Sequence, residues 1–396
     1  MSEREEGLNI NRFGRLSPRG LAALIAVLLA VGLLAAALVV SAFGGSGTTP
    51  PLDQAIEAAL AAPPPAGITA QVSVSDHVFD ASSLGPAGGL VAPLLSGASG
   101  ELWVGSDGEA RLDLQTALGA IEVFSDETDL TVYDAAANTA WRLALPPRSV
   151  GASPGPPSLA DIDRVLAELG GYAQLSGPIS DTVAGQAADT VTLSPTAGAG
   201  LLGSVALSFD AATGVPLRLA IEANGSTTPV LEFTLTSISY AAVPASDVEV
   251  DLPSGLNIVT LNASSAGVAA AGPPPSGLGA VTQAVPFTLV APDTLGGLPR
   301  SGVHLLGTGS AAGALVTYGT GLRALVVAER STPAVAGGEA GLLDLLPSLS
   351  IGGASGHVLA TALGTIITFD RAGVSYVLAG SVDQADAEAA AQALAS

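Results

Sequence analysis

The residues whose spacing most resembles a chemical motif are the glycines of "GAGLLG" at positions 198–203. The pattern G-x-G-x-x-G binds the pyrophosphate of a dinucleotide when a strand precedes it and a helix follows it. Here Val205, Leu207 and Phe209 alternate with small or polar residues, "DAATG" forms a turn, and the alternation resumes from Leu217. This pattern predicts a β-hairpin. We therefore interpret the glycines as a strand connection and expect no cofactor.

The ionisable residues offer no evident catalytic or metal-binding set. His77, His304 and His357 are scattered, and the sequence has no H-E-x-x-H or G-x-S-x-G motif. The acidic residues at 126–129 fit a turn between strands, and those at 161–163 fit the first turn of a helix. Without Lys or Cys, the chain cannot use a Schiff-base lysine or a thiol nucleophile. We expect a protein that is not an enzyme, with no metal site.

The charge of the chain excludes another class of partner. The formal net charge is −22, and all 13 basic residues are arginines that form no cluster along the sequence. Nucleic-acid binding depends on grouped cations that neutralise phosphates. The composition therefore predicts no nucleic-acid partner.

Residues 21–43 form an uncharged apolar run of 23 residues. A helix of this length crosses a bilayer core of about 30 Å, whereas the apolar part of a cleaved signal peptide is usually about 7–15 residues long. The alternative of a cleaved signal peptide has weak support from the small residues at 40–42. Arginines precede the run at 1–20, so we expect a single-pass anchor in the cell membrane, with a cytoplasmic tail and the bulk of the chain extracytoplasmic.

The remaining chain divides by composition. A flexible linker at 44–51 leads into a first domain at 52–260, which begins with an amphipathic helix at 52–62 and includes a second helix at 158–169. A segment rich in Ala, Gly and Pro at 261–280 predicts a linker. A smaller C-terminal α+β domain follows at 281–396. Its expected strands are 287–290, 302–306, 314–318, 322–328, 357–362, 365–370 and 374–380, with a final helix at 384–394.

The first domain shows the period of two that is typical of strands with one wet face. Its apolar positions are candidates for lining a cavity, although ordinary core packing is the alternative for each of them. These candidates are Val72, Val74, Leu102, Val104, Leu112, Leu114, Ile121, Val123, Val205, Leu207, Phe209, Leu217, Leu219, Ile221 and Phe233. An apolar loop between the first two strands supplies lid candidates, for which core packing is again the alternative: Leu90, Val91, Leu94 and Leu95.

Three segments of the first domain together resemble a known family: "GITAQVSVSD", "DLTVYDAAANTAWRLALP" and "GSVALSFDAATGVPLRLAIEANG" with the following "PVLEFTLTSISY". They resemble the lipoprotein carriers of the LolA family and the related RseB/MucB regulators of envelope stress, in the membrane-anchored form of high-GC bacteria. The C-terminal segment resembles a small domain of unknown function. The resemblance implies an α+β fold in which helices cover an unclosed antiparallel β-barrel with an aliphatic cavity for the acyl chains of lipoproteins.

Two hypotheses of function follow. In the first, the chain is a membrane-anchored extracytoplasmic protein that binds the acyl chains of lipids or lipoproteins. In the alternative, it is an RseB-like sensor or regulator of envelope stress that contacts an anti-sigma factor or a transporter. The family's soluble shuttle has neither an anchor nor an extra domain, so shuttling between membranes does not follow from the resemblance.

Overall fold

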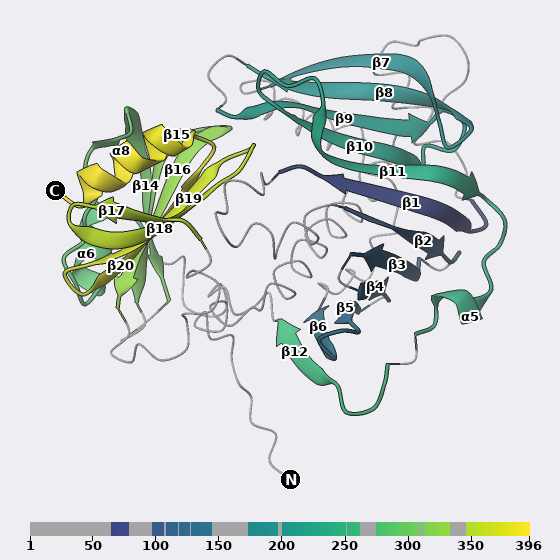
Figure 1. Ribbon diagram of the computed structural model, residues 1–396, viewed down its shortest axis with the longest axis horizontal. Helices are drawn as coiled ribbons and strands as arrows, with labels where there is room; N and C mark the ends of the chain where they lie inside the picture. Colours follow the sequence, from purple (N-terminus) through teal and green to yellow (C-terminus); the bar gives the residue numbers. More distant parts are fainter. Residues whose placement is uncertain are drawn as a thin grey trace.

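The computed structural model describes residues 65–78, 97–144, 173–196, 200–261, 275–332 and 346–396, with positions 107, 118, 127, 251, 308, 310 and 311 omitted. These residues form a sheet of twelve strands and a sheet of eight strands (Figure 1). Within them, no helix has the length and apolar character needed to cross a membrane. The predicted anchor, the predicted helices at 52–62 and 158–169 and the four lid candidates lie outside the described residues.

The first sheet contains the strands that the alternating pattern predicts, and two others, the seventh and the twelfth. Its members are β1 (Ile68–Asp76), β2 (Ala98–Val104), β3 (Ala110–Thr116), β4 (Gly119–Ser125), β5 (Asp129–Asp134), β6 (Thr139–Ala144), β7 (Ala173–Val183), β8 (Gln186–Pro195), β9 (Leu202–Asp210), β10 (Pro216–Ala223), β11 (Pro229–Ser239) and β12 (Asn257–Leu261). Strands β2 to β6 form an antiparallel meander. The sheet is curled like half a barrel.

The strand order of the first sheet is β12-β6-β5-β4-β3-β2-β1-β11-β10-β9-β8-β7. Strand β1 therefore joins two consecutive runs of strands, because it pairs with β2 on one side and with β11 on the other. Strand β12 pairs in parallel with β6, whereas the family resemblance implies an antiparallel barrel. Strands β9 and β10 form an antiparallel hairpin, which confirms that the glycines before them connect strands.

Gly100 marks a close approach between the backbones of β2 and β3. A Cβ atom placed on it would lie 1.8 Å from the main-chain oxygen of Asp113 on the neighbouring strand β3. Glycine inside a strand commonly marks a bend of a curled sheet or a close approach of two backbones. The absent side chain at this position lets the two strands approach each other closely.

We expect Gly100→Ala to lower the free energy of unfolding by about 2 kcal/mol, because the methyl group must displace the backbone of β3. Chemical denaturation followed by tryptophan fluorescence measures this change, since Trp103 and Trp141 both lie in the first sheet. Gly225→Ala is the control, because a Cβ there has no neighbour within 4 Å, although its φ of +80° adds backbone strain that Gly100 does not have. Equal losses in the two variants would contradict the close-approach explanation.

A buried carboxylate fixes the turn between β9 and β10. Asp210 is 2% exposed, and its Oδ1 accepts hydrogen bonds from the backbone N–H groups of Ala212 (2.7 Å) and Thr213 (2.9 Å). Its Oδ2 accepts a hydrogen bond of 2.6 Å from the hydroxyl of Tyr240, directly after β11. Burial, followed by this hydrogen bond, raises the pKa of Tyr240 well above its ordinary value. The contact ties the end of β11 to the β9–β10 hairpin.

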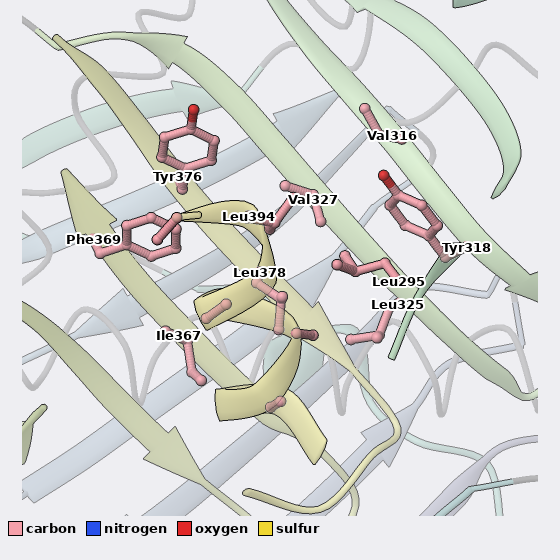
Figure 2. Packing of buried hydrophobic residues seen from close by; sticks show 14 of the residues in the cluster. Leu295, Val316, Tyr318, Leu325, Val327, Ile367, Phe369, Tyr376, Leu378 and Leu394 are labelled. Atoms are coloured by element: carbon pink, nitrogen blue, oxygen red, sulfur yellow. The ribbon is translucent and has the colours of Figure 1, made fainter. Parts of the chain in front are cut away.

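The second sheet has its own hydrophobic core. Its strands are β13 (Thr294–Leu295), β14 (Leu298–Leu306), β15 (Gly313–Thr320), β16 (Arg323–Ser331), β17 (Ser348–Ile351), β18 (Ala354–Ala360), β19 (Thr365–Arg371) and β20 (Val374–Gly380). Helix α8 (Gln384–Leu394) places Ala387, Ala390, Ala391 and Leu394 in this core. Figure 2 shows Leu394 beside the sheet residues Phe369, Leu378 and Val327. Small alanines let the helix approach the sheet closely.

Glu329 lies inside this second core, at 1% exposure. Its Oε2 accepts a hydrogen bond of 3.0 Å from the backbone N–H of Val290, while Oε1 is buried without a partner. Burial raises the pKa of Glu329 to about 7, and the Val290 hydrogen bond opposes this shift. The hydroxyl of Tyr318 is also buried without a partner, and burial raises its pKa to about 12. The largely apolar interior of the second sheet therefore includes two buried polar groups, the Glu329 carboxyl and the Tyr318 hydroxyl.

Two expectations about the second sheet need correction. The strand expected at 287–290 is not formed, because this segment packs against the core with Phe287, Leu289 and Val290 and donates the N–H of Val290 to the Glu329 side chain. Helix α6 (Leu278–Ala284) occupies the end of the segment expected to be a linker. The described residues are mostly β: their helices are α5 (Ala245–Val248), α6 and α8, so the expected α+β class overstates the helical share of the described chain.

Candidate functional site

The predicted cavity residues lie on one face of the first sheet. Directly paired residues in neighbouring strands project to the same side, and the register pairs Ala70 with Leu102, Leu102 with Leu112, and Leu112 with Val123. It also links Val74 to Phe233, Phe233 to Leu219, and Leu219 to Leu207. Tracing the paired residues from strand to strand in this way places all fifteen candidates on one side of the sheet, which we call the apolar face. Their contact with a ligand stays a prediction.

Burial divides the apolar face into two parts. Over β3 to β5 the side chains are buried and belong to one core cluster, as shown by Leu112, Val123 and Val132, which are 7%, 3% and 1% exposed. Over β7 to β10, six apolar side chains are only partly buried. We call these six the apolar patch: Leu175, Leu193, Val205, Leu207, Leu219 and Ile221.

The register makes the apolar patch continuous. One row across the strands runs Leu231–Ile221–Val205–Leu193–Leu175, and the next runs Phe233–Leu219–Leu207–Val191. Phe209 and Leu217, both 0% exposed, continue the face beside the second row. The packing is therefore dense at one margin of the patch and incomplete within it. The sequence predicts four of the patch residues and misses Leu175 and Leu193, although "DTVTL" in β8 alternates clearly enough to show Leu193.

The opposite face of the same sheet is polar. Arg111 donates two hydrogen bonds to Asp113, at 2.9 and 2.8 Å, lies 3.7 Å from Glu122, and lies 5.6 Å from the ring centre of Trp103. Arg218 forms a short ion pair with Glu232. These charged groups are paired with one another, within β3 for Arg111 and Asp113 and across neighbouring strands for the other pairs. The sheet is therefore strongly amphipathic.

The charged residues that project from the apolar face are all acidic within the described part of the chain. Asp76 at the end of β1 pairs with Leu231, Asp134 at the end of β5 pairs with Ile121, and Asp189 in β8 pairs with Phe209. Asp134 and Asp189 are 4% and 5% exposed. Burial raises the pKa of Asp76, although a hydrogen bond of 2.9 Å from the N–H of Val78 to its Oδ1 opposes the shift. Asp76 and Asp189 lie at opposite corners of the apolar patch.

Turns of the second sheet contact the strand ends that border the patch. The N–H of Ala362 donates to the carbonyl of Val78, just after β1, at 2.8 Å. The N–H of Leu201, just before β9, donates to the hydroxyl of Ser381 at 3.0 Å. A Cβ on Gly200 would lie 2.2 Å from the carbonyl oxygen of Ser381. The second sheet therefore adjoins the apolar patch at one end.

Of the residues considered for catalysis or metal binding, those that the structure describes are not brought together, and the acidic residues at 161–163 lie outside the described residues. His77 donates its backbone N–H to Val230, His304 lies in β14, and His357 lies in β18 with its Nδ1 3.4 Å from the carbonyl of Leu346. Asp126 accepts hydrogen bonds from the N–H groups of Thr128 and Asp129, as expected for a turn. Across the described ranges, no group of three or more His, Cys, Asp or Glu residues could hold a metal ion.

The chain is similar to several solved structures. No protein-family model and no curated protein sequence matches the chain. Similar solved structures include the MucA/MucB complex of Pseudomonas aeruginosa. The matched chain of this complex is 14% identical to the present chain, and the match covers 82% of this chain and 91% of that chain, with a TM-score of 0.42. A LolA-superfamily protein of Nitrosomonas europaea is 11% identical to this chain. The match covers 52% of this chain and 99% of that chain, with a TM-score of 0.22.

A lipoprotein-sorting protein domain of Vibrio parahaemolyticus, described as putative and outer-membrane, is 10% identical, with 46% of this chain and 89% of that chain covered and a TM-score of 0.20. The solved structures thus include members of the families that the sequence resembles. Scores of this size do not assign a function to the chain.

Proposed function

We propose that this protein binds acyl chains of lipids or lipoproteins on the apolar face of its first sheet, and that it binds its ligand without transforming it. The apolar patch carries this proposal, because six neighbouring aliphatic side chains of one face are left partly exposed. A contiguous exposed apolar surface commonly marks a binding site. Each methylene group of an acyl chain buried there contributes about 0.8 kcal/mol.

In the proposed arrangement, residues 21–43 anchor the chain in the cell membrane and the two sheets lie on the extracytoplasmic side. The length of the apolar run and the arginines that precede it support this placement. A binding surface tethered near a bilayer meets its lipid ligands at the membrane itself. Phe209 and Leu217, which are fully buried beside the patch, would form the floor against which a chain is held.

We expect Leu207→Asp to weaken binding of a fluorescent acyl probe at least about tenfold, because a carboxylate at the middle of the patch must lose water when a chain covers it. The measurement is a titration of the delipidated protein with the probe. Thermal unfolding of the variant, followed by tryptophan fluorescence, tests whether the sheet is intact.

Ala206→Asp is the matched control, since Ala206 lies in the same strand but projects from the polar face. Equal loss in both variants would attribute the effect to damage of the strand. Failure of the unaltered protein to take up any acyl probe, together with co-purification of a membrane regulator, would favour the alternative of a regulatory protein.

A further inference from the structure

The two faces of the first sheet differ in their charged groups: the polar face carries both arginines and carboxylates, whereas the charged residues described on the apolar face are all carboxylates. The arginines that the structure describes in this sheet are Arg111, Arg142 and Arg218, and the register places all three on the polar face. Asp76, Asp134 and Asp189 project from the apolar face. From the described residues of the first sheet itself, a ligand on the apolar face would therefore meet carboxylates and no guanidinium group.

In the described part of the chain, none of these three carboxylates forms an ion pair with an arginine, although His77 adjoins Asp76 and interacts with it electrostatically. Asp76 accepts from the N–H of Val78, Asp134 from the N–H of Ala137 at 2.9 Å, and Asp189 from the hydroxyl of Ser180 at 3.2 Å. These donors are uncharged, so the negative charge of each carboxylate acts on its surroundings. In contrast, the arginines Arg111 and Arg218 are paired with carboxylates of their own face.

Three segments outside the described residues also carry more acidic residues than arginines. Segments 44–64, 79–96 and 145–172 contain six acidic residues, Asp53, Glu57, Asp80, Asp161, Asp163 and Glu168, against two arginines, Arg148 and Arg164. The net charge of the whole chain is −22. Charged groups that are partly shielded from water interact more strongly than those in bulk solvent. A head group held near the apolar patch would feel a negative field.

We propose that the apolar face selects acyl amphiphiles by charge and prefers those with an ammonium-bearing head over anionic ones of equal chain length. This inference rests on the proposed function, because it assumes that the apolar patch binds an acyl chain. Asp76 and Asp189 lie at opposite corners of the patch, so the head group of a chain that crosses it in either direction lies near a carboxylate. Free fatty acids and other anionic lipids would be poor ligands.

The experiment compares three probes with the same twelve-carbon chain: dodecyltrimethylammonium, uncharged dodecyl maltoside and dodecanoate. Each is titrated below its critical micelle concentration against the delipidated protein loaded with N-phenyl-1-naphthylamine, an uncharged fluorescent reporter. We expect the ammonium probe to bind at least about tenfold more tightly than dodecanoate, with the maltoside between them, and added salt to reduce the difference.

The double variant Asp76→Asn/Asp189→Asn should reduce this preference to about threefold or less, since the amides keep the acceptor oxygens but lose the charges. The control Glu101→Gln/Glu222→Gln removes the same charge from the polar face and should leave the preference unchanged. Asp76→Asn alone serves if the double variant does not fold.

Two results would overturn the inference while leaving acyl binding intact: dodecanoate binding as tightly as the ammonium probe, or an equal change of preference in the control pair. Failure of all three probes, and of the reporter, to bind would instead contradict the proposed function itself.

Discussion

Replacing Glu329 with glutamine is expected to remove most of the pH dependence of the stability of the second sheet. The pKa of Glu329 is raised by burial to about 7, from an ordinary value of 4.5. Between these values the folded protein keeps a proton that the unfolded chain releases. The free energy of unfolding therefore falls as the pH rises from about 4.5 to 7, by about 3 kcal/mol in total, and no further loss from this group occurs above pH 7.

Differential scanning calorimetry at pH 5 and pH 8 measures this effect. We expect the unaltered protein to unfold at a lower temperature at pH 8, and Glu329→Gln to restore much of the difference while still accepting the hydrogen bond of Val290. Glu388→Gln on the exposed side of α8 is the matched control, and it should behave like the unaltered protein. An unchanged pH dependence in Glu329→Gln would show that another group is responsible.

Asp210→Ala is expected to destabilise the first sheet by about 3 kcal/mol. The substitution removes the acceptor of two backbone N–H groups and of the Tyr240 hydroxyl, and each buried donor left without a partner costs about 1–3 kcal/mol. Tyr240→Phe removes one of these three contacts, and we expect it to cost about 1 kcal/mol. The two effects should be less than additive, because the variants share one hydrogen bond.

Urea denaturation followed by tryptophan fluorescence measures both variants and their combination, since both tryptophans lie in the first sheet. Asp181→Ala is the control, because Asp181 is an exposed residue of β7 and its replacement should change stability by less than about 0.5 kcal/mol. A loss in Asp210→Ala no larger than that of the control would contradict a structural role for the buried carboxylate.

The strands that the sequence predicts correctly are those with one apolar and one polar face. In β3 and β10 the alternation of Leu112 with Arg111, and of Leu217 with Arg218, identifies both the strand and its buried side. Strand β7 is missed because it lies at the edge of the sheet, where one row of backbone groups needs no partner strand. Its sequence, which includes Gly177 and Pro178, shows no regular period.

Other features depend on contacts that are distant in sequence. Strand β12 pairs with β6 across more than a hundred residues, and short strands carry no signal of parallel pairing. The segment that ends at Val290 has the composition of a strand, but a buried side chain, Glu329, accepts its hydrogen bond. The apolar face is predictable residue by residue, whereas the incomplete burial of the patch and the carboxylates beside it become visible only when the strands are placed in register.

The position of β1 also has a consequence for biosynthesis. One edge of this strand is satisfied as soon as β2 follows it, but the other edge requires β11, which ends at Ser239. During translation, the open edge of β1 therefore has no partner strand until more than 150 further residues have been synthesised. Such exposed strand edges promote aggregation of nascent chains. The yield of correctly folded protein should consequently depend on how quickly the stretch from β7 to β11 is synthesised.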